Sequence, residues 1–360
     1  MHNRGMKIII ITFCVVFSSF IFSCSLPAQN DNIPVDSESR DAAQYFSQSR
    51  CLGGHDSYGF IRKLTLRLKA KTAAEKTVVK AYARLAQSKI PAFLALLSNE
   101  VTWKYEGMEH TVPFAGTFSG KEGVENFIRN LRRSIVITNL ACRYHVSEDN
   151  SVNVHFLEEG YVKSTGKKYA MEVAHLWQID SRGKVIGFQC FNDTFALFSA
   201  FIPGNDPAWS IQMHTADYQI PGSKFPNALG AVQNLYAAFA AGNLQYILDN
   251  VSDNVVWIMA GNTSAVPFAG TYSGKQGVQQ FFINLMSSVG YDGPYTQMSY
   301  VVDGGRIDVR MYESAYSLAD PAKKLRNYVL HSISINDEGK ITSFRSYNDT
   351  YAQQNIFDWH

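Results

Sequence analysis

The hydrophobic positions of this chain follow a set of patterns and then repeat it. Apolar residues recur at helical spacing from Val78 to Ala86 and again from Val232 to Phe239. A second short helical pattern follows each of them, over residues 90–97 and 244–251. Later segments alternate apolar and polar residues, the period typical of strands with one buried face. Each half therefore predicts helices followed by a mostly antiparallel sheet, which is an α+β fold.

A short segment shows that the two halves are copies of one another. Residues 112–123 and 266–277 are the same except at two positions. The period of about 155 residues is far longer than the units of solenoid proteins and matches a whole domain. We therefore expect a duplicated globular domain, in which each residue of one copy has a twin at the equivalent position of the other.

Breaks in these patterns divide the chain into five segments. Pro203-Gly204 and Pro221-Gly222 interrupt the periodic regions and mark an irregular linker. The predicted segments are a signal peptide at 1–24, a tether and lead-in at 25–72, a first domain at 73–201, a linker at 202–224 and a second domain at 225–360.

The composition supports folded domains and offers no general case for nucleic-acid binding. The chain is 46% hydrophobic and 18% charged, as globular proteins are, and its formal net charge is only +2. A basic run from Arg62 to Lys80 is the local exception. It fits a solvated lead-in, and contact with acidic lipid or a partner is the alternative.

The repeated segment itself has a structural explanation. Ser119 and Glu122 fit the S-x-x-E/Q pattern of a capping box, as do their twins in the second copy. The neighbouring glycines allow a tight turn into the following helix. Anion binding at that helix N-terminus, helped by Lys121, is the functional alternative.

The N-terminus reads as a targeting segment. Arg4 and Lys7 precede an apolar run over residues 8–22, which suits the core of a secretory signal. The run ends at Cys24 in a context that resembles a bacterial lipoprotein cleavage site; ordinary cleavage after Ala28 is the alternative. We therefore expect an exported protein of the bacterial cell envelope, either anchored to the membrane through a lipidated Cys24 or periplasmic.

The cysteines and histidines show no metal-binding pattern. Beyond the targeting segment the chain holds Cys51, Cys142 and Cys190, an odd number for disulfide pairing. There is no C-x-x-C motif and no His/Cys cluster at zinc spacing. We expect neither a metal nor a cofactor.

A histidine and an aspartate recur around the last hairpin of each copy. Alternation places His175 and its twin His331 on the apolar, inward face of a strand. Asp193 and Asp349 follow the next strand, 18 residues later in each case. Such pairs are candidates for acid–base catalysis. A core histidine with a helix-capping aspartate is the structural alternative.

An earlier strand carries a second shared set. Glu158 and Tyr161 have the twins Glu313 and Tyr316. We expect these to be exposed strand residues.

The order of these features resembles a known family. Each half resembles SnoaL-like domains in the order of its features. These are a helix with a tyrosine, a strand with a tryptophan, the motif F-A-G-x-x-S-G-K-x-G, a strand with a histidine, a G-K hairpin and a terminal aspartate. That group belongs to the nuclear transport factor 2-like superfamily, which includes ketosteroid isomerase and polyketide cyclases. The resemblance implies two tandem cone-shaped α+β barrels, each a curved sheet wrapped round helices and enclosing an apolar pocket.

The resemblance transfers functional residues only in part. Tyr82 and Tyr236 match the isomerase tyrosine that stabilises an oxyanion, but Tyr105 and Ala174 stand where it has catalytic carboxylic acids, and their twins are not acidic either. The cyclases use a strand histidine and a later aspartate, which the pairs above resemble better. The residues expected to be catalytic are His175, Asp193, His331 and Asp349. The residues expected to line the pockets are Tyr82, Trp103, Trp177, Tyr236 and Trp257.

These observations lead to one expected function and one alternative. The first is an exported protein that binds a small apolar or aromatic molecule in two pockets, with acid–base catalysis of the isomerase, cyclase or dehydratase type. The alternative is a non-catalytic binding or assembly module of the cell envelope, built as a covalent pseudo-dimer. Nucleic acid is not an expected partner, and an intramolecular pseudo-dimer or a homo-oligomer is the expected assembly.

Overall fold

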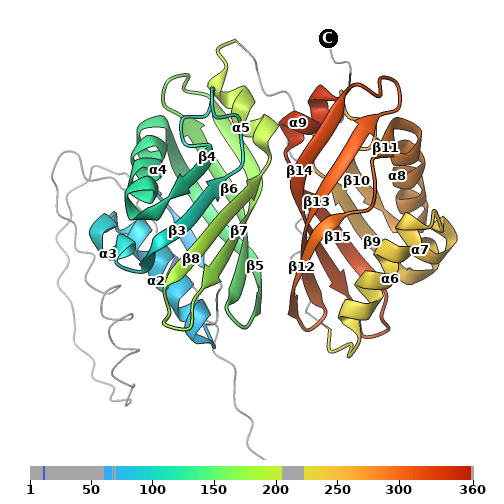
Figure 1. Cartoon of the computed structure of the whole chain (residues 1–360), viewed down its shortest axis with the longest axis horizontal. Coiled ribbons are helices and arrows are strands. Elements are labelled where there is room, and N and C mark those ends of the chain that lie inside the picture. Colours follow the sequence, from blue (N-terminus) through green and yellow to red (C-terminus); the bar gives the residue numbers. More distant parts are fainter. Residues whose placement is uncertain (1–10, 13–60, 67, 69, 205–222, 358–360) are drawn as a thin grey trace, which may run out of the picture.

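The chain folds into two mixed α+β halves that lie side by side (Figure 1). The computed structural model describes residues 11–12, 61–66, 68, 70–204 and 223–357. In each half a curled sheet faces the other half, and helices cover its far side. The predicted cleavage sites at Cys24 and Ala28 lie outside the described residues.

The first half is built on an eight-stranded sheet. Its strands pair in the order β1-β2-β5-β6-β7-β8-β3-β4, and all pairs are antiparallel except β2 with β5 and β3 with β8. The elements in chain order are β1 (Ile11–Thr12), β2 (Leu64–Leu66), α2 (Ala73–Ala86), α3 (Ile90–Leu94), β3 (Leu97–Tyr105), β4 (Gly116–Ser119), α4 (Gly120–Ser134), β5 (Ile135–Glu148), β6 (Ser151–Val162), β7 (Lys168–Ile179), β8 (Val185–Asn192) and α5 (Thr194–Phe201).

The second half repeats this arrangement with seven strands. The order is β10-β9-β15-β14-β13-β11, with β12 also paired to β13, and only β9 and β15 run parallel. The elements are α6 (Ala228–Ala240), α7 (Leu244–Asn250), β9 (Val251–Met259), β10 (Gly270–Ser273), α8 (Gly274–Ser288), β11 (Val289–Tyr291), β12 (Thr296–Asp303), β13 (Arg306–Ser317), β14 (Lys324–Ile335), β15 (Ile341–Tyr347) and α9 (Thr350–Asn355). The predicted α+β fold in tandem is confirmed.

The turn into α4 differs from the predicted capping box. Ser119 is the N-cap residue, but its side chain makes no capping hydrogen bond, and the same holds for its twin. The chain turns instead at Gly120, whose φ of 68° suits glycine. A complete capping box occurs at α2, where Thr72 and Glu75 bond each other's backbone amides. The glycine prediction is therefore correct and the predicted serine–glutamate bond is wrong.

Strand β6 is buried on both faces. Val154 and Phe156 belong to the core of the first half. Asn153 and His155 point the other way and are 3% and 1% exposed. They are covered by β13 of the second half, where both side chains bond the Asp308 carboxyl oxygen Oδ2 at 2.9 and 2.8 Å. The two halves thus share a buried polar contact between their sheets.

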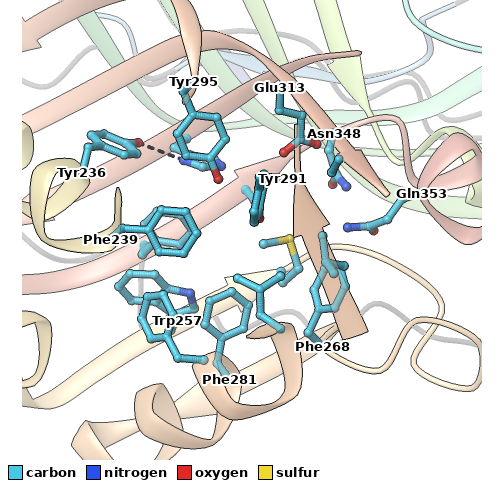
Figure 2. A pocket seen from close by; sticks show the side chains of 18 of the residues that line it. Tyr236, Phe239, Trp257, Phe268, Phe281, Tyr291, Tyr295, Glu313, Asn348 and Gln353 are labelled. Atoms are coloured by element: carbon cyan, nitrogen blue, oxygen red, sulfur yellow. Dashed lines mark hydrogen bonds between the residues drawn. The ribbon is translucent and has the colours of Figure 1, made fainter. Parts of the chain in front are cut away.

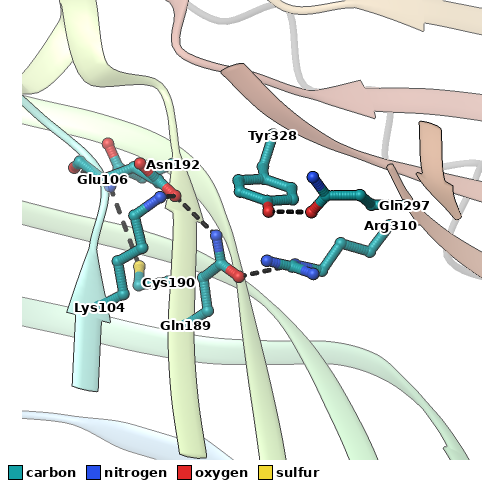
Figure 3. A network of polar contacts seen from close by, with 8 residues as sticks. All are labelled: Lys104, Glu106, Gln189, Cys190, Asn192, Gln297, Arg310 and Tyr328. Carbon is teal, nitrogen blue, oxygen red and sulfur yellow. Dashed lines mark hydrogen bonds and ion pairs between the residues drawn. The ribbon is translucent and has the colours of Figure 1, made fainter. Parts of the chain in front are cut away.

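Further polar pairs extend this contact across the sheets. Gln189 of β8 accepts a hydrogen bond of 2.8 Å from the Arg310 Nε atom of β13 (Figure 3). The Arg310 guanidinium lies 4.0 Å from the centre of the Tyr328 ring, and the Lys104 ammonium lies 5.2 Å from the same ring. Side chains of both halves therefore contribute cations and their partners to the contact between the two sheets.

Candidate functional site

The second half encloses a cavity between its sheet and helices. Its volume is about 60 Å³, room for about four water molecules at roughly 10 to 15 Å³ each. Aromatic side chains supply much of its wall, as Figure 2 shows; they include Tyr236, Phe239, Trp257, Phe268, Phe281 and Tyr291. A concave, mostly apolar space with a few polar groups is the usual form of a small-molecule site.

A tyrosine–histidine pair forms one side of this cavity. The Tyr236 hydroxyl on α6 lies 2.9 Å from the His331 Nδ1 atom on β14. Burial lowers the pKa of His331 to about 3, so the imidazole is neutral near pH 7. The same burial raises the pKa of Tyr236 well above its ordinary value. The pair therefore positions two neutral polar groups and is not charged at neutral pH.

Glu313 of β13 brings a titratable group into the same cavity. Its side chain lines the wall, and no hydrogen bond to it occurs among the described residues. Burial raises the pKa of its carboxyl group from 4.5 to about 7. A carboxyl group with this pKa exists as both acid and base near neutral pH, which is the condition for general acid–base catalysis.

Glu313 lies at the polar end of the cavity. Figure 2 shows it gathered with Asn348 and Gln353, on the far side from Tyr236. Asn348 and Gln353 are each 3% exposed, and their side-chain oxygens have no hydrogen-bond partner among the described residues. Unsatisfied buried oxygens are rare in folded proteins, and a ligand that donates hydrogen bonds would satisfy them.

The first half contains a matching cavity that differs at its polar end. Its volume is also about 60 Å³, and Tyr82, Trp103, Trp177, His175 and Glu158 are among its lining residues. The Tyr82 hydroxyl lies 2.9 Å from His175 Nδ1 and accepts a hydrogen bond from the Trp177 indole. Burial lowers the pKa of His175 to about 3. The tyrosine–histidine pair therefore occurs in both halves.

The glutamate of the first half already has a partner. Tyr169 donates a hydrogen bond of 2.9 Å to the Glu158 carboxyl group, and burial raises the pKa of that group to about 7. Leu325 is the twin of Tyr169, so the second half lacks this donor. Leu197 likewise stands where the second half has Gln353. Among the described residues, the cavity of the second half therefore holds the glutamate without a hydrogen-bond partner.

The expectation that Glu158 and Glu313 are exposed strand residues is wrong. Glu158 is 3% exposed and both side chains line cavities. The strand pattern carries the signal: Val154, Phe156 and Glu158 share one face of β6, because side chains alternate along a strand. A glutamate in phase with inward apolar residues must itself point inward.

The structure separates the predicted aspartates from the histidines. Neither Asp193 nor Asp349 is among the lining residues of the two cavities. Asp193 is the N-cap of α5, where it accepts hydrogen bonds from the Ala196 amide and, at 2.6 Å, from the Thr350 hydroxyl of the other half. Asp349 caps α9 and accepts the reciprocal bond of 2.6 Å from Thr194.

This placement follows from the hairpin register. His175 is opposite Cys190, and Asp193 comes after the end of β8, where the chain turns into α5. The aspartates therefore join the two halves through a symmetric pair of contacts. Their catalytic role stays a prediction. Their contacts are those of helix-capping residues, which was the structural alternative.

No cluster of three or more metal-ligating side chains occurs in the part of the chain that the structure describes. Within the same residues, no helix is long and apolar enough to cross a membrane.

Comparison with known proteins places the first half in a family. Residues 78–188 match the model of the SnoaL-like domain. No curated protein matches the chain.

Solved structures match about one third of the chain over nearly their whole length. An NTF2-like protein from Burkholderia thailandensis E264 is 25% identical, covers 37% of this chain and 99% of its own, and has a TM-score of 0.33. TerC, co-crystallised with polyporic acid, is 20% identical, with coverages of 36% and 98% and a TM-score of 0.33. A Mycobacterium tuberculosis protein in complex with estradiol-17beta-hemisuccinate is 13% identical, with coverages of 35% and 98% and a TM-score of 0.31.

The family match and the fold lead to one assignment. The matched residues run from within α2 into β8, the span that builds the first sheet and its cavity. Residues 78–188 are a SnoaL-like domain, and the second half of the chain repeats its cone-shaped α+β fold.

Proposed function

We propose that the second half binds a small apolar or aromatic molecule in its cavity and that Glu313 moves a proton on it. The observation that supports this is the Glu313 carboxyl group, which faces the cavity with a pKa of about 7 and without a hydrogen-bond partner among the described residues. A fold by itself does not define a reaction, so the proposal depends on this group and its surroundings.

The expected step is reversible removal of a proton next to a carbonyl group. The Glu313 carboxylate takes the proton from carbon, and the electron pair of that C–H bond forms the enolate. The amide groups of Asn348 and Gln353 carry both donors and acceptors, so they can turn N–H groups toward the enolate oxygen. When the protonated Glu313 first exchanges its proton with solvent and then protonates the same carbon, the result is exchange. When a C=C bond is conjugated with the enolate and Glu313 protonates the far end of that dienolate, the result is isomerisation.

The test measures proton exchange on a ligand of suitable size. Cyclohexanone in D₂O at pH 7 exchanges its α-protons for deuterium, which NMR detects. The wild-type protein should accelerate this exchange, and Glu313→Gln should reduce the acceleration at least 100-fold, the low end for a lost general base. Glu158→Gln is the matched control, because its cavity has the same volume but a satisfied glutamate, and should change the rate less than twofold. Equal losses in both variants, or none in either, would refute the assignment.

The first half is proposed to be the structural partner in this arrangement. Its glutamate is hydrogen-bonded to Tyr169, and Ile61 of the lead-in segment lines its cavity. The reciprocal Asp–Thr contacts between α5 and α9 resemble a two-fold dimer interface within one chain. These contacts favour the expected intramolecular pseudo-dimer, in which the two halves are the two protomers.

Export to the bacterial cell envelope is part of the proposal. The support is the basic and apolar N-terminal sequence that ends at Cys24. Metabolic labelling with radioactive palmitate tests the lipid anchor, and Cys24→Ala should abolish the label. A labelled Cys24→Ala variant would contradict lipidation at this residue.

A further inference from the structure

A wide apolar groove lies outside the cavity of the second half. It has a volume of about 670 Å³, about eleven times that of the cavity itself, and its lining residues include no charged side chain. Its walls are formed by Ala237 and Ala240 of α6, Met286 of α8, residues 293–295 before β12, and Met298 of β12. Met286 is 55% exposed, an unusual position for a large apolar side chain.

The groove and the cavity share one wall. Tyr236, Phe239, Tyr291 and Tyr295 line both spaces. The Tyr295 ring stacks on Phe239 with centres 6.0 Å apart and meets the Tyr236 ring edge-on at the same distance. A layer of aromatic rings therefore separates the cavity from the apolar groove.

The first half differs at this place. Ile137 and Tyr291 are opposite the twins Gly160 and Ala315, and Ala141 and Thr296 are opposite the twins Leu157 and Tyr312, so residues 138–140 correspond to the longer segment 292–295. In the first half β2 runs alongside residues 140–141, and Ile61 bridges to Ile137. In the second half the corresponding residues carry Tyr291 and Tyr295 and border the groove. The lead-in strand β2 thus covers the cavity of the first half, whereas aromatic side chains beside the groove cover the cavity of the second half.

We propose that the second half takes one elongated ligand, with a compact hydrogen-bonding head at Glu313 and a neutral apolar tail in the groove. This rests on the proposed function for the position of the head. The cavity has room only for a compact head, so a longer molecule must extend past Tyr295. The tail is uncharged, because the lining residues offer no charge to pair with one.

The test uses phenol, 4-ethylphenol, 4-butylphenol and 4-hexylphenol as probes of increasing tail length. Trp257 lines the cavity, so its fluorescence reports binding. Each methylene buried in the groove should lower the dissociation constant about fourfold, with one site per chain. Ala237→Trp and Ala240→Trp fill the groove and should remove this gain while changing phenol affinity less than twofold. Gln233→Trp, at an exposed position of the same helix outside the groove lining, is the matched control and should keep it.

The outcomes separate this proposal from the proposed function. A dissociation constant that does not change with tail length overturns the elongated ligand, even where cyclohexanone exchange depends on Glu313. An equal gain per methylene in both Ala→Trp variants and in the wild type also overturns it. A groove-dependent gain without Glu313-dependent exchange supports the tail site and refutes only the proton transfer.

Discussion

Replacing Glu158 by glutamine removes a carboxyl group that the fold keeps protonated at a cost. The pKa of this group is about 7 in the folded protein, against an ordinary value of 4.5. Below pH 4.5 the carboxyl group is protonated in both the folded and the unfolded chain, and it carries no penalty. Between pH 4.5 and 7 the unfolded chain loses the proton while the folded chain retains it, so the free energy of unfolding falls as pH rises.

The size of the effect follows from the pKa difference. The folded and ordinary pKa values differ by about 2.5, and at about 1.36 kcal/mol for each pKa unit this lowers the free energy of unfolding by about 3 kcal/mol above pH 7. Glutamine has a similar shape and no proton to lose, and Tyr169 can still donate to its oxygen. The stability of Glu158→Gln relative to wild type should therefore increase by about 3 kcal/mol between pH 4 and pH 8.

Urea unfolding followed by tryptophan fluorescence at several pH values measures this difference. Subtracting wild type from variant removes the contributions of all other titrating groups. Glu125→Gln is the control, because it removes one negative charge from an exposed position on α4. A stability difference that stays constant within about 0.5 kcal/mol across the window would show that burial does not hold this carboxyl group protonated.

Two further predictions concern the contact between the halves. Asp349→Ala removes the cap of α9 and the acceptor of the Thr194 hydroxyl, so it should lower the free energy of unfolding by about 1 kcal/mol. The rate of cyclohexanone exchange should stay within twofold of wild type. Loss of exchange in a variant of unchanged stability would identify Asp349 as the base instead. His155→Leu removes the hydrogen bonds to Tyr347 and to the buried Asp308 carboxyl group. It should cost about 2 kcal/mol in urea unfolding, and a cost below about 0.5 kcal/mol would show that the contact does not stabilise the pair of halves.

The duplication and the fold class could be read from the sequence, because both depend on local patterns. Helical spacing around Tyr82, alternation around His175 and the repeated glycine turn are properties of neighbouring residues. Alternation also determined that Glu158 and Glu313 point inward, although their polarity led us to expect exposure. For these two glutamates, the two-residue alternation of the strand predicted burial correctly, whereas the polarity of the side chain did not.

The partners of the polar side chains were decided by tertiary structure. Alternation places Asn153 and Asp308 on outward faces, which in an isolated sheet would be solvated, but the second half buries both of them. Asp193 bonds Thr350 because the two halves dock at α5 and α9, a contact between residues 157 positions apart. The sequence alone predicted two α+β domains and the inward face of strands such as the one that carries Glu158, and the family resemblance implied their cone shape. The docking of the cones and the cover over each cavity depend on contacts between distant segments, so only the tertiary structure decided which polar residues bind a ligand and which hold the halves together.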